Sequence, residues 1–473
     1  MPAQRGGADL LAEDGSIFVH LDWHVGHHAK AVLDEVFGAS NFRNEIVWHY
    51  YNKFQGNVNR FASDHDVIFW YSKSAKYRFQ QIKEKREGGT VRQIKRKWDK
   101  DTGRIVNAKG PDGKVQYQET DERTIDDVWR LSMLQPADQT QNLGYPTQKP
   151  ESLIERILGA STAEGDLVLD CFVGSGTTVA VAERMGRRWI AADLGRFAIH
   201  TTRKRLLGVE SVRPFVVQNL GKYERQLWQV AEFGESAESR TSAYRAFVLD
   251  LYHAKPVSGH SWLHGLKQGR MVHIGTVDAP VTAGDIKQIV TEFRKTIGTG
   301  KDAPKKQSVD VLGWDFAFEL NELARQDAEL AGIELRLVRI PREVLEKRAV
   351  EQGDIRFFEL AALSIDVKEK GRKVTLTLDD FIIPLDDVPA DIQKAVTHWS
   401  QWIDYWAVDW NNKSDTFHNE WQTYRTRKDN DLTRSVEHEY DVPGEYLVVV
   451  KVIDILGNDT TKTVAVKVAG RAS

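Results

Sequence analysis

Short apolar runs alternate with helical patterns through the first half of the chain. Residues 17–21 alternate between apolar and polar positions as a strand does, and residues 29–37 show the three- and four-residue spacing of a helix. Further on, an apolar run at 166–169 predicts a buried strand, residues 179–185 a helix, and residues 189–192 a second strand. This order predicts an α/β domain with a doubly wound sheet.

The second half of the chain shows two further patterns. Between residues 227 and 385, strand-like runs such as 309–312 alternate with helical ones such as 315–330, which predicts an accessory α/β domain. Residues 386–473 have an all-β pattern, and the last two strands are joined across Gly457-Asn458, which is favourable hairpin chemistry. We therefore expect three domains, at residues 1–226, 227–385 and 386–473.

The most informative stretch is a glycine-rich turn, Asp170-Cys171-Phe172-Val173-Gly174-Ser175-Gly176-Thr177-Thr178, between the strand and the helix. Glycines let the backbone come close to a ligand, and the first N–H groups of the helix point at it. A second carboxylate, Asp193, ends the next strand, where it suits a ribose diol. Together these features predict a nucleotide-type cradle.

The composition of the turn decides which nucleotide it accepts. No Lys lies between Gly174 and Arg184, so the turn is not a phosphate-binding P-loop, and it lacks the third glycine of a dinucleotide fold. Asp170 would repel a pyrophosphate but attract the ammonium group of an amino acid. S-adenosylmethionine is therefore the better ligand, and the alternative is a turn that only joins a strand to a helix.

Residues around the turn carry a resemblance to a known family. Residues 147–158, Thr-Gln-Lys-Pro-Glu-Ser-Leu-Ile-Glu-Arg-Ile-Leu, followed by the D-x-F-x-G-S-G-T-T loop, resemble the bacterial DNA amino-methyltransferases of the β-ordered group, which includes type III restriction-modification methylases. Residues 15–24 and 41–48 match that group as well, so the resemblance covers about residues 10–220. It implies an S-adenosylmethionine-dependent methyltransferase fold, with double-stranded DNA and a restriction subunit as partners.

The same resemblance implies the reaction and the cofactor pocket. It favours methyl transfer to the exocyclic amine of adenine (N6), with cytosine N4 as the alternative. The implied cofactor-binding residues are Asp170, Phe172, Gly174, Ser175, Gly176 and Thr177 around the methionine part, Asp193 at the ribose, and Thr147 and Lys149 beside the pocket.

One family motif is missing from this chain. The catalytic Asp-Pro-Pro-Tyr/Phe motif would lie upstream of residues 15–18, and the chain contains no Pro-Pro pair, so no catalytic residue is assigned. We expect a methyltransferase truncated at its N-terminus and inactive alone, or one part of a split enzyme whose first segment is encoded separately. A noncatalytic DNA- and cofactor-binding subunit and a nonfunctional remnant are the alternatives. The strand that carries the motif would be absent too, which leaves an exposed sheet edge.

A basic segment lies within an expected DNA-recognition insertion at about residues 73–130. Residues 73–109 contain 13 Lys or Arg and 4 Asp or Glu, so their net charge is 13 − 4 = +9. Such charge binds phosphates by releasing counterions, and Trp98 could stack or wedge. We expect DNA contact, with an exposed charged hairpin as the alternative. The expected DNA-binding residues are Arg92, Lys95, Arg96 and Lys97.

Bulk composition excludes several other classes. The net charge of −3 argues against a uniformly basic DNA coat. A single cysteine, Cys171, excludes a disulfide framework and fits the reducing cytoplasm. No apolar run approaches the ~20 residues of a membrane span. His24, His27 and His28 lack a Cys or a close acidic pair, so no metal is expected.

The last strands carry a second resemblance. Residues 438–446, His-Glu-Tyr-Asp-Val-Pro-Gly-Glu-Tyr, and the hairpin that follows resemble the end of a polycystic-kidney-disease-type immunoglobulin-like sandwich. The resemblance implies an accessory interaction module. The aromatic residues Tyr405, Trp406 and Trp410 are expected in its core rather than in a ligand platform.

Overall fold

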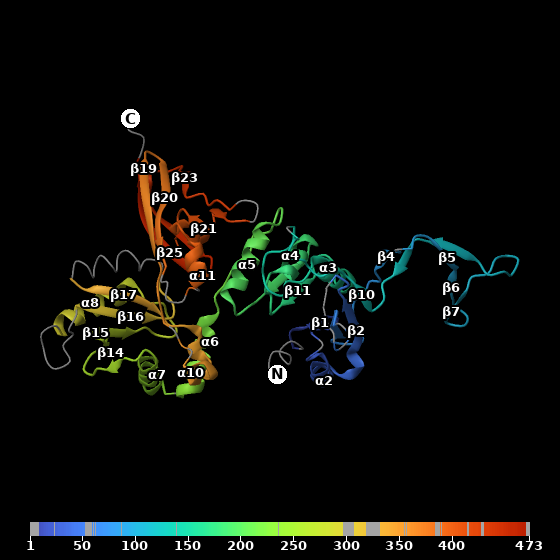
Figure 1. Ribbon diagram of the computed structural model, residues 1–473, viewed down its shortest axis with the longest axis horizontal. Coiled ribbons are helices and arrows are strands. Elements are labelled where there is room, and N and C mark those ends of the chain that lie inside the picture. The colour runs from blue at the N-terminus through green and yellow to red at the C-terminus, as the bar shows by residue number, and fades with distance from the viewer. Residues whose placement is uncertain are drawn as a thin grey trace. The chain divides into compact units, whose positions relative to one another are not determined.

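The computed structural model describes most of the chain, which divides into two compact units. The units are residues 1–214 and 215–473 (Figure 1). The described residues are 9–22, 24–52, 59, 61, 63–86, 88–138, 140–234, 236–296, 307–317, 332–353, 355, 357–383, 388, 390–413, 416–426 and 430–469.

A four-stranded sheet forms the first layer of the first unit. Its order is β1 (Ser16–Leu21), β3 (His65–Ser72), β2 (Phe42–His49) and β10 (Val128–Arg130). β3 runs antiparallel to both β1 and β2, and β10 runs parallel to β2. Because successive side chains of a strand point to opposite faces, each strand contributes residues to both sides of the sheet.

Helices cover both faces of this sheet. The helix α2 (Gly26–Phe37) packs Leu33 and Phe37 against one face. The helix α3 (Glu151–Ser161) packs Leu153 against the other face, beside Trp48 and Trp70. Both faces of the sheet are therefore buried.

A separate sheet holds the glycine-rich turn. It pairs β11 (Leu167–Asp170) in parallel with β12 (Arg188–Ala191), and α4 (Thr177–Arg184) connects the two strands. Val168 packs with α3 and α4 on one face. The helix α5 (Arg196–Leu207) follows β12.

The other face of this small sheet is uncovered. Leu167, Leu169 and Ile190 are 53%, 44% and 55% exposed there, although parallel sheets are normally covered on both faces. The expected α/β class is confirmed, but the strands lie in two sheets instead of one. Among the described residues, β1 ends its sheet and β11 pairs only with β12.

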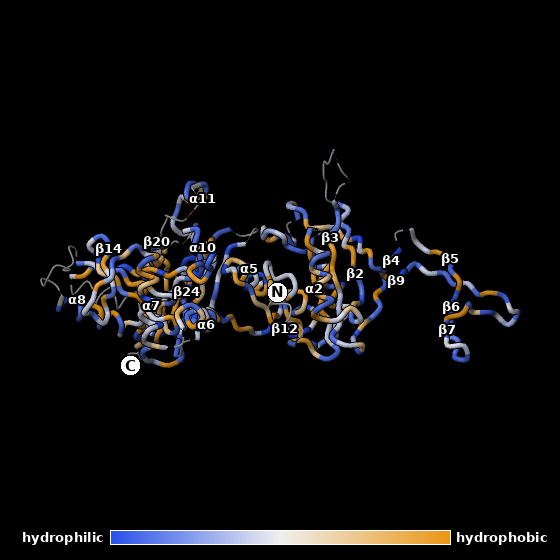
Figure 2. The backbone as a smooth tube through the Cα atoms, turned by 90° about the horizontal axis from the view of Figure 1, so that it is seen from below, coloured by the Kyte–Doolittle hydropathy of each residue, from blue (hydrophilic) through white to orange (hydrophobic). Residues whose placement is uncertain are grey.

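A paired arm leaves the first unit between β3 and β10. It consists of three two-stranded pieces: β4 (Lys83–Lys85) with β9 (Glu122–Thr124), β5 (Val91–Ile94) with β8 (Tyr117–Thr120), and β6 (Arg96–Asp99) with β7 (Arg104–Asn107). Figure 2 shows apolar positions interleaved with polar ones along it.

The second unit begins with two helices and a six-stranded sheet. The helices are α6 (Gly221–Phe233) and α7 (Ala237–Leu251). Two more helices lie between strands of the sheet in chain order, α8 (Ala283–Thr296) and α10 (Lys347–Gln352). The sheet order is β13 (Lys255–Pro256), β14 (Gly265–Lys267), β15 (Arg270–Ile274), β16 (Ser308–Gly313), β17 (Glu334–Arg339) and β18 (Phe358–Glu359). β15, β16 and β17 are parallel, as the alternating pattern predicts. The helix expected over 315–330 lies mostly outside the described residues.

The C-terminal part is a β-sandwich with one shared core. One sheet contains β19 (Ala362–Lys370), β20 (Lys373–Ile382) and β23 (Ser435–Glu439). The other contains β22 (Trp421–Tyr424), β21 (Ile403–Asp409), β24 (Gly444–Asp454) and β25 (Asp459–Val468), and the short helix α11 (Ala390–Ala395) lies between β20 and β21. The expected terminal hairpin is β24–β25, and Tyr405, Trp406 and Trp410 are buried as expected.

Both expected domain boundaries move. The helix α6 belongs to the second unit because Arg225 donates to Asp315 at 2.6 Å and Trp228 packs on Tyr244. Residues 362–382 belong to the sandwich because β20 pairs with β23. The local pattern of apolar and polar residues predicts where strands form. Which core a strand joins is decided by its pairing with strands that are distant in the sequence.

Two neighbouring histidines are buried beside β15. Nδ1 of His273 lies 2.7 Å from the Trp262 carbonyl oxygen, and Nδ1 of His264 accepts from the Ile274 N–H at 2.9 Å. Burial lowers the pKa of His264 to about 3, helped by His273, and lowers the pKa of His273 to about 4. Both imidazoles are therefore uncharged in the folded protein at pH 5.

We predict that acid destabilises this unit. Below about pH 6.5 the unfolded chain protonates these histidines while the folded protein does not. The free energy of unfolding should fall by up to about 1.4 kcal/mol per pH unit for each histidine. Urea unfolding of the full chain between pH 7 and pH 5 measures the slope. His264→Gln should flatten it and the exposed His28→Asn should not, and equal slopes in wild type and His264→Gln would contradict the prediction.

Candidate cofactor site and nucleic-acid interface

Two carboxylates meet at the ends of β11 and β12. The strands are parallel, and Asp170 lies opposite Ala191. Asp193, two residues after Ala191, therefore lies at the same end of the sheet as Asp170. Asp193 accepts from the N–H groups of Gly174 at 2.9 Å and Gly195 at 2.8 Å. The register of the two strands thus brings the predicted Asp170 and Asp193 to one end of the sheet.

Gly174 and Gly176 give the turn its shape. Both have left-handed backbones, with φ of 50° and 76°. A Cβ on Gly176 would lie 2.8 Å from Oγ1 and 3.0 Å from Cα of Thr202 on α5. Gly176 is therefore required for the close approach of the turn to α5 as well as for its φ.

The side chains of Ser175 and Thr177 are buried and bonded within the protein. Their hydroxyl oxygens are 3.2 Å apart, and Thr177 donates to the Lys149 carbonyl oxygen at 3.2 Å. These two predicted residues therefore stabilise the turn from the side that faces the protein interior. Phe172, by contrast, is 79% exposed at the mouth of the turn.

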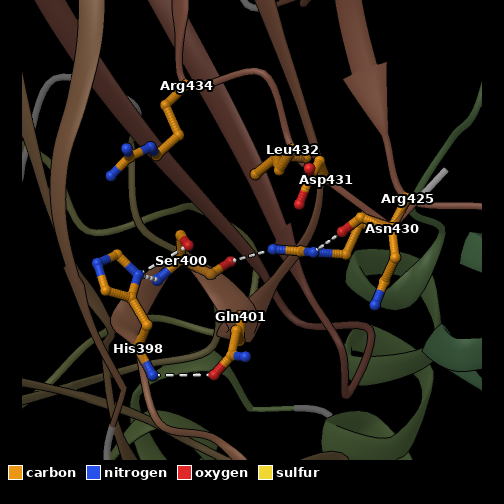
Figure 3. Close-up of a pocket in the computed structure, with 8 residues that line it drawn as sticks. All are labelled: His398, Ser400, Gln401, Arg425, Asn430, Asp431, Leu432 and Arg434. Carbon is orange, nitrogen blue, oxygen red and sulfur yellow. Dashed lines mark hydrogen bonds between the residues drawn. The ribbon is translucent and has the colours of Figure 1, made fainter.

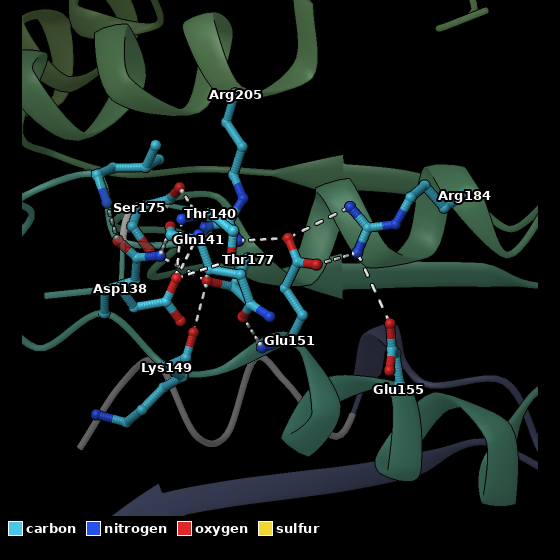
Figure 4. Close-up of polar contacts among 12 residues, drawn as sticks. Asp138, Thr140, Gln141, Lys149, Glu151, Glu155, Ser175, Thr177, Arg184 and Arg205 are labelled. Carbon is cyan, nitrogen blue, oxygen red and sulfur yellow. Dashed lines mark hydrogen bonds and ion pairs between the residues drawn. The ribbon is translucent and has the colours of Figure 1, made fainter. Parts of the chain in front are cut away.

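A buried arginine ties the turn to two helices (Figure 4). Nη1 of Arg205 donates to Thr177 Oγ1 at 2.9 Å and to the Ser175 carbonyl oxygen at 3.3 Å. Nη2 donates to Glu151 at 2.7 Å, and Glu151 also pairs with Arg184 at 2.6 Å. The Arg205 side chain is only 7% exposed, so its charge is compensated mainly by Glu151.

The carboxylate of Glu151 is held in its charged form. Burial alone would raise the pKa of Glu151, but hydrogen bonds from Arg205 and Arg184 hold it below its ordinary value. Sequence reasoning missed Glu151 and Arg205 as determinants of the site. Glu151 begins α3 and Arg205 lies near the end of α5, and no local pattern connects positions 54 residues apart.

A second polar cluster, also missed from the sequence, lies where α3 begins. Asp66 on β3 accepts from Tyr50 at 3.2 Å, and Nε2 of His20 lies 2.9 Å from its other oxygen. Burial lowers the pKa of Lys149, against the attraction of Asp66. The predicted Lys149 therefore lies between this cluster and the turn. The predicted Thr147 is exposed, with a left-handed φ of 62°.

The predicted DNA-binding residues are all exposed on the arm. They do not share one face, because neighbouring strand residues such as Arg96 and Lys97 point to opposite sides. The guanidinium of Arg92 lies over the Tyr117 ring at 4.5 Å. The arm is thus an exposed, charged, paired ribbon, and its contact with DNA stays a prediction.

Other candidate sites offer fewer groups that could bind a ligand or take part in catalysis. A cavity of about 520 Å³ in the sandwich is lined by His398, Ser400, Gln401, Arg425, Asn430, Asp431, Leu432 and Arg434 (Figure 3). Arg425 donates to the carbonyl oxygens of Ile403 and Ser400, so it supports the backbone there. Within the described ranges, no group of His, Cys, Asp or Glu could hold a metal ion, and no helix is long and apolar enough to span a membrane.

Comparison with known proteins assigns the first unit to a family. The family model described as DNA methylase matches residues 7–204. The Type II methyltransferase M1.MboII of Moraxella bovis is 32% identical over 191 residues, which cover 39% of this chain and 70% of that protein. The chain belongs to the DNA methylase family. The resemblance carried by residues 147–158 and the glycine turn is confirmed.

Other relatives of this DNA methylase chain are matched over smaller shares of their own length. M.EcaI of Enterobacter cloacae is 28% identical over 264 residues, covering 45% of this chain and 58% of that protein. M2.DpnII of Streptococcus pneumoniae is 49% identical over 86 residues, covering 18% of this chain and 32% of that protein. The chain therefore spans less than two thirds of the length of both proteins.

Solved structures are similar to the methylase chain at a low level. The crystal structure of the M1.HpyAVI-SAM complex covers 43% of this chain and 81% of its own, with 20% identity and a TM-score of 0.29. The PKD1 domain of Vibrio anguillarum Epp covers 24% of this chain and 98% of its own, with 15% identity and a TM-score of 0.15. The family assignment rests on the sequence matches.

We predict that Gly176→Ala damages the turn of this methylase through contact with Thr202. Gly165 is a matched control, since its φ is also left-handed, at 83°, but no atom lies within 4 Å of the position that a Cβ would take there. The left-handed backbone costs each variant roughly 1 kcal/mol, and the clash should add roughly 1–3 kcal/mol in Gly176→Ala alone. Thermal unfolding measures the difference, and equal losses in the two variants would contradict this role of Gly176.

Proposed function

We propose that this chain is the cofactor- and DNA-binding part of a DNA amino-methyltransferase from a restriction-modification system, and that it uses S-adenosylmethionine. Family membership supports the reaction class, and relatives such as M1.MboII and M.EcaI are named Type II methyltransferases. The observation that carries the cofactor assignment is the pair of carboxylates, Asp170 and Asp193, at one end of a glycine-rich turn.

The donor set of the turn fits S-adenosylmethionine and does not fit a phosphate. Residues 170–178 contain a carboxylate and an exposed aromatic ring, but no Lys or Arg. Asp170 would pair with the ammonium group. Asp193 would accept from the ribose hydroxyls, because carboxylate oxygens keep acceptor capacity beyond the two N–H groups already bound. When bound, the cofactor supplies an electrophilic methyl group on sulfur.

The proposed substrate is the exocyclic amine of adenine in double-stranded DNA. An enzyme that acts on a paired base rotates it out of the helix, and holding the amine in line with the methyl group supplies much of the acceleration. Adenine N6 rests on the family resemblance, and cytosine N4 is the alternative because none of the assigned residues reads the base. A cytoplasmic location agrees with a DNA substrate and a single cysteine.

We further infer that a separate segment supplies the base-holding motif, because the sequence has no Pro-Pro pair. The exposed face of Leu167, Leu169 and Ile190, and the side of β11 on which no described strand pairs, suit a strand with its own helix.

We predict that Asp170→Asn weakens S-adenosylmethionine binding about tenfold. The Asn oxygen can still accept from the Phe172 N–H, as Asp170 does at 3.0 Å, but the charged partner of the ammonium group is lost. Isothermal titration calorimetry with the full chain measures the change, with Glu210→Gln as an exposed control. No heat in the wild type, or equal affinity in both variants, would refute the cofactor assignment.

We predict that this chain alone transfers no methyl groups to DNA above background. Adding a segment with the Asp-Pro-Pro-Tyr motif from a family relative should restore transfer, because it holds the target amine. Mass spectrometry of digested DNA identifies the product. N6-methyladenine supports the proposal and N4-methylcytosine supports the alternative, while transfer by the chain alone would contradict the need for a second segment.

A further inference from the structure

The arm divides into two hairpins at its end. The strands β5 and β8 form a stalk that closes at a three-way junction, where the Lys95 N–H donates to Gln116, the Ala108 N–H to Lys95, and the Gln116 N–H to Ala108, all at 2.7–2.9 Å. Ala108 is buried at this junction. One hairpin is β6–β7, and the other spans the bridge between Lys109 and Val115.

The β6–β7 hairpin presents an apolar pair to solvent. Trp98 lies directly opposite Ile105, so both side chains are on the same face. They are 62% and 65% exposed. Single exposed apolar residues are common, but a directly paired Trp and Ile on a basic ribbon suggest a surface that is covered when a partner binds.

Positive charge occupies both faces of the same hairpin. Arg96 shares the face of Trp98, whereas Lys97 and Arg104 lie on the opposite face, and Lys100 lies in the connecting turn. A ribbon lying along the outside of DNA would meet one phosphate backbone. A ribbon inside the major groove is flanked by two, and that groove is wide enough for a two-stranded ribbon.

We propose that the β6–β7 hairpin enters the major groove of double-stranded DNA and that Trp98 and Ile105 contact the base edges there. This inference rests on the DNA substrate proposed above and adds the element and the residues that reach the bases. In that groove the thymine methyl group is the apolar feature of the base edges, so it is the contact that Trp98 and Ile105 would make. Lys97, Arg104 and Arg96 would contact the phosphates on either side.

Charge complementarity favours a polyanion such as DNA as the partner of this surface. Residues 96–107 contain Arg96, Lys97, Lys100 and Arg104 against Asp99 and Asp101, a net charge of 4 − 2 = +2. Asp101 and Thr102 bond to the side chain of Asp99 at 3.1 and 2.9 Å, so Asp99 shapes the turn. One of the two carboxylates is thus engaged within the hairpin itself.

Salt-dependent binding separates the two kinds of contact. Using the full chain and a mixed-sequence 40-base-pair duplex, we expect Trp98→Ala to weaken binding about 5- to 20-fold at every salt concentration, because an apolar contact to the base edges carries no charge. The slope of log affinity against log salt should not change. Lys97→Ala should lower that slope by about 0.9, the value for one phosphate contact.

The base contact is tested with the same duplex in which uracil replaces thymine. The wild type should bind the uracil duplex several-fold more weakly, Trp98→Ala should bind both duplexes equally, and Trp98→Phe should keep part of the difference. Tyr223→Ala, which removes another exposed aromatic ring, is the control. A wild type that binds neither duplex overturns the DNA substrate itself. A wild type that binds both equally, or a Trp98→Ala variant that keeps the difference, overturns only the groove contact.

Discussion

The glycine-rich turn depends on the buried guanidinium of Arg205. Its hydrogen bonds to Thr177 and Ser175 stabilise the turn from the side that faces the protein interior, and Glu151 supplies the opposite charge. A buried charge that loses its partner is strongly destabilising, so the turn and the start of α3 must keep their relative positions. Because the donors of Arg205 are used inside the protein, the open side of the turn is left to Asp170, Phe172 and Asp193.

The start of α3 connects the two sheets of the first unit. Lys149 accepts a hydrogen bond from the turn through its carbonyl oxygen and lies near Asp66 of the four-stranded sheet through its side chain. The same helix packs on both sheets, through Leu153 on one and Leu158 on the other. The turn is therefore connected to the four-stranded sheet by one rigid element, although the small sheet remains exposed on its other face.

Local patterns predicted much of this molecule. Strand-like apolar patterns identified β1, β16 and β25, and the glycines with their flanking carboxylates identified the turn, because each signal lies within about 20 residues. The pairs Glu151–Arg205 and His20–Asp66 could not be predicted, since they join residues 54 and 46 positions apart. The forked end of the arm and the membership of β19 and β20 in the sandwich depend on strand pairing, which a period-two pattern does not specify.

Hydrogen exchange with and without S-adenosylhomocysteine tests the cofactor assignment most directly, because it locates binding along the chain. If the turn holds the cofactor, the amides of residues 170–178 and 193–197 should exchange more slowly with the ligand present, while those of the sandwich should not change. Unchanged exchange in those two segments at saturating ligand would contradict the assignment, whatever the DNA-binding properties of the arm.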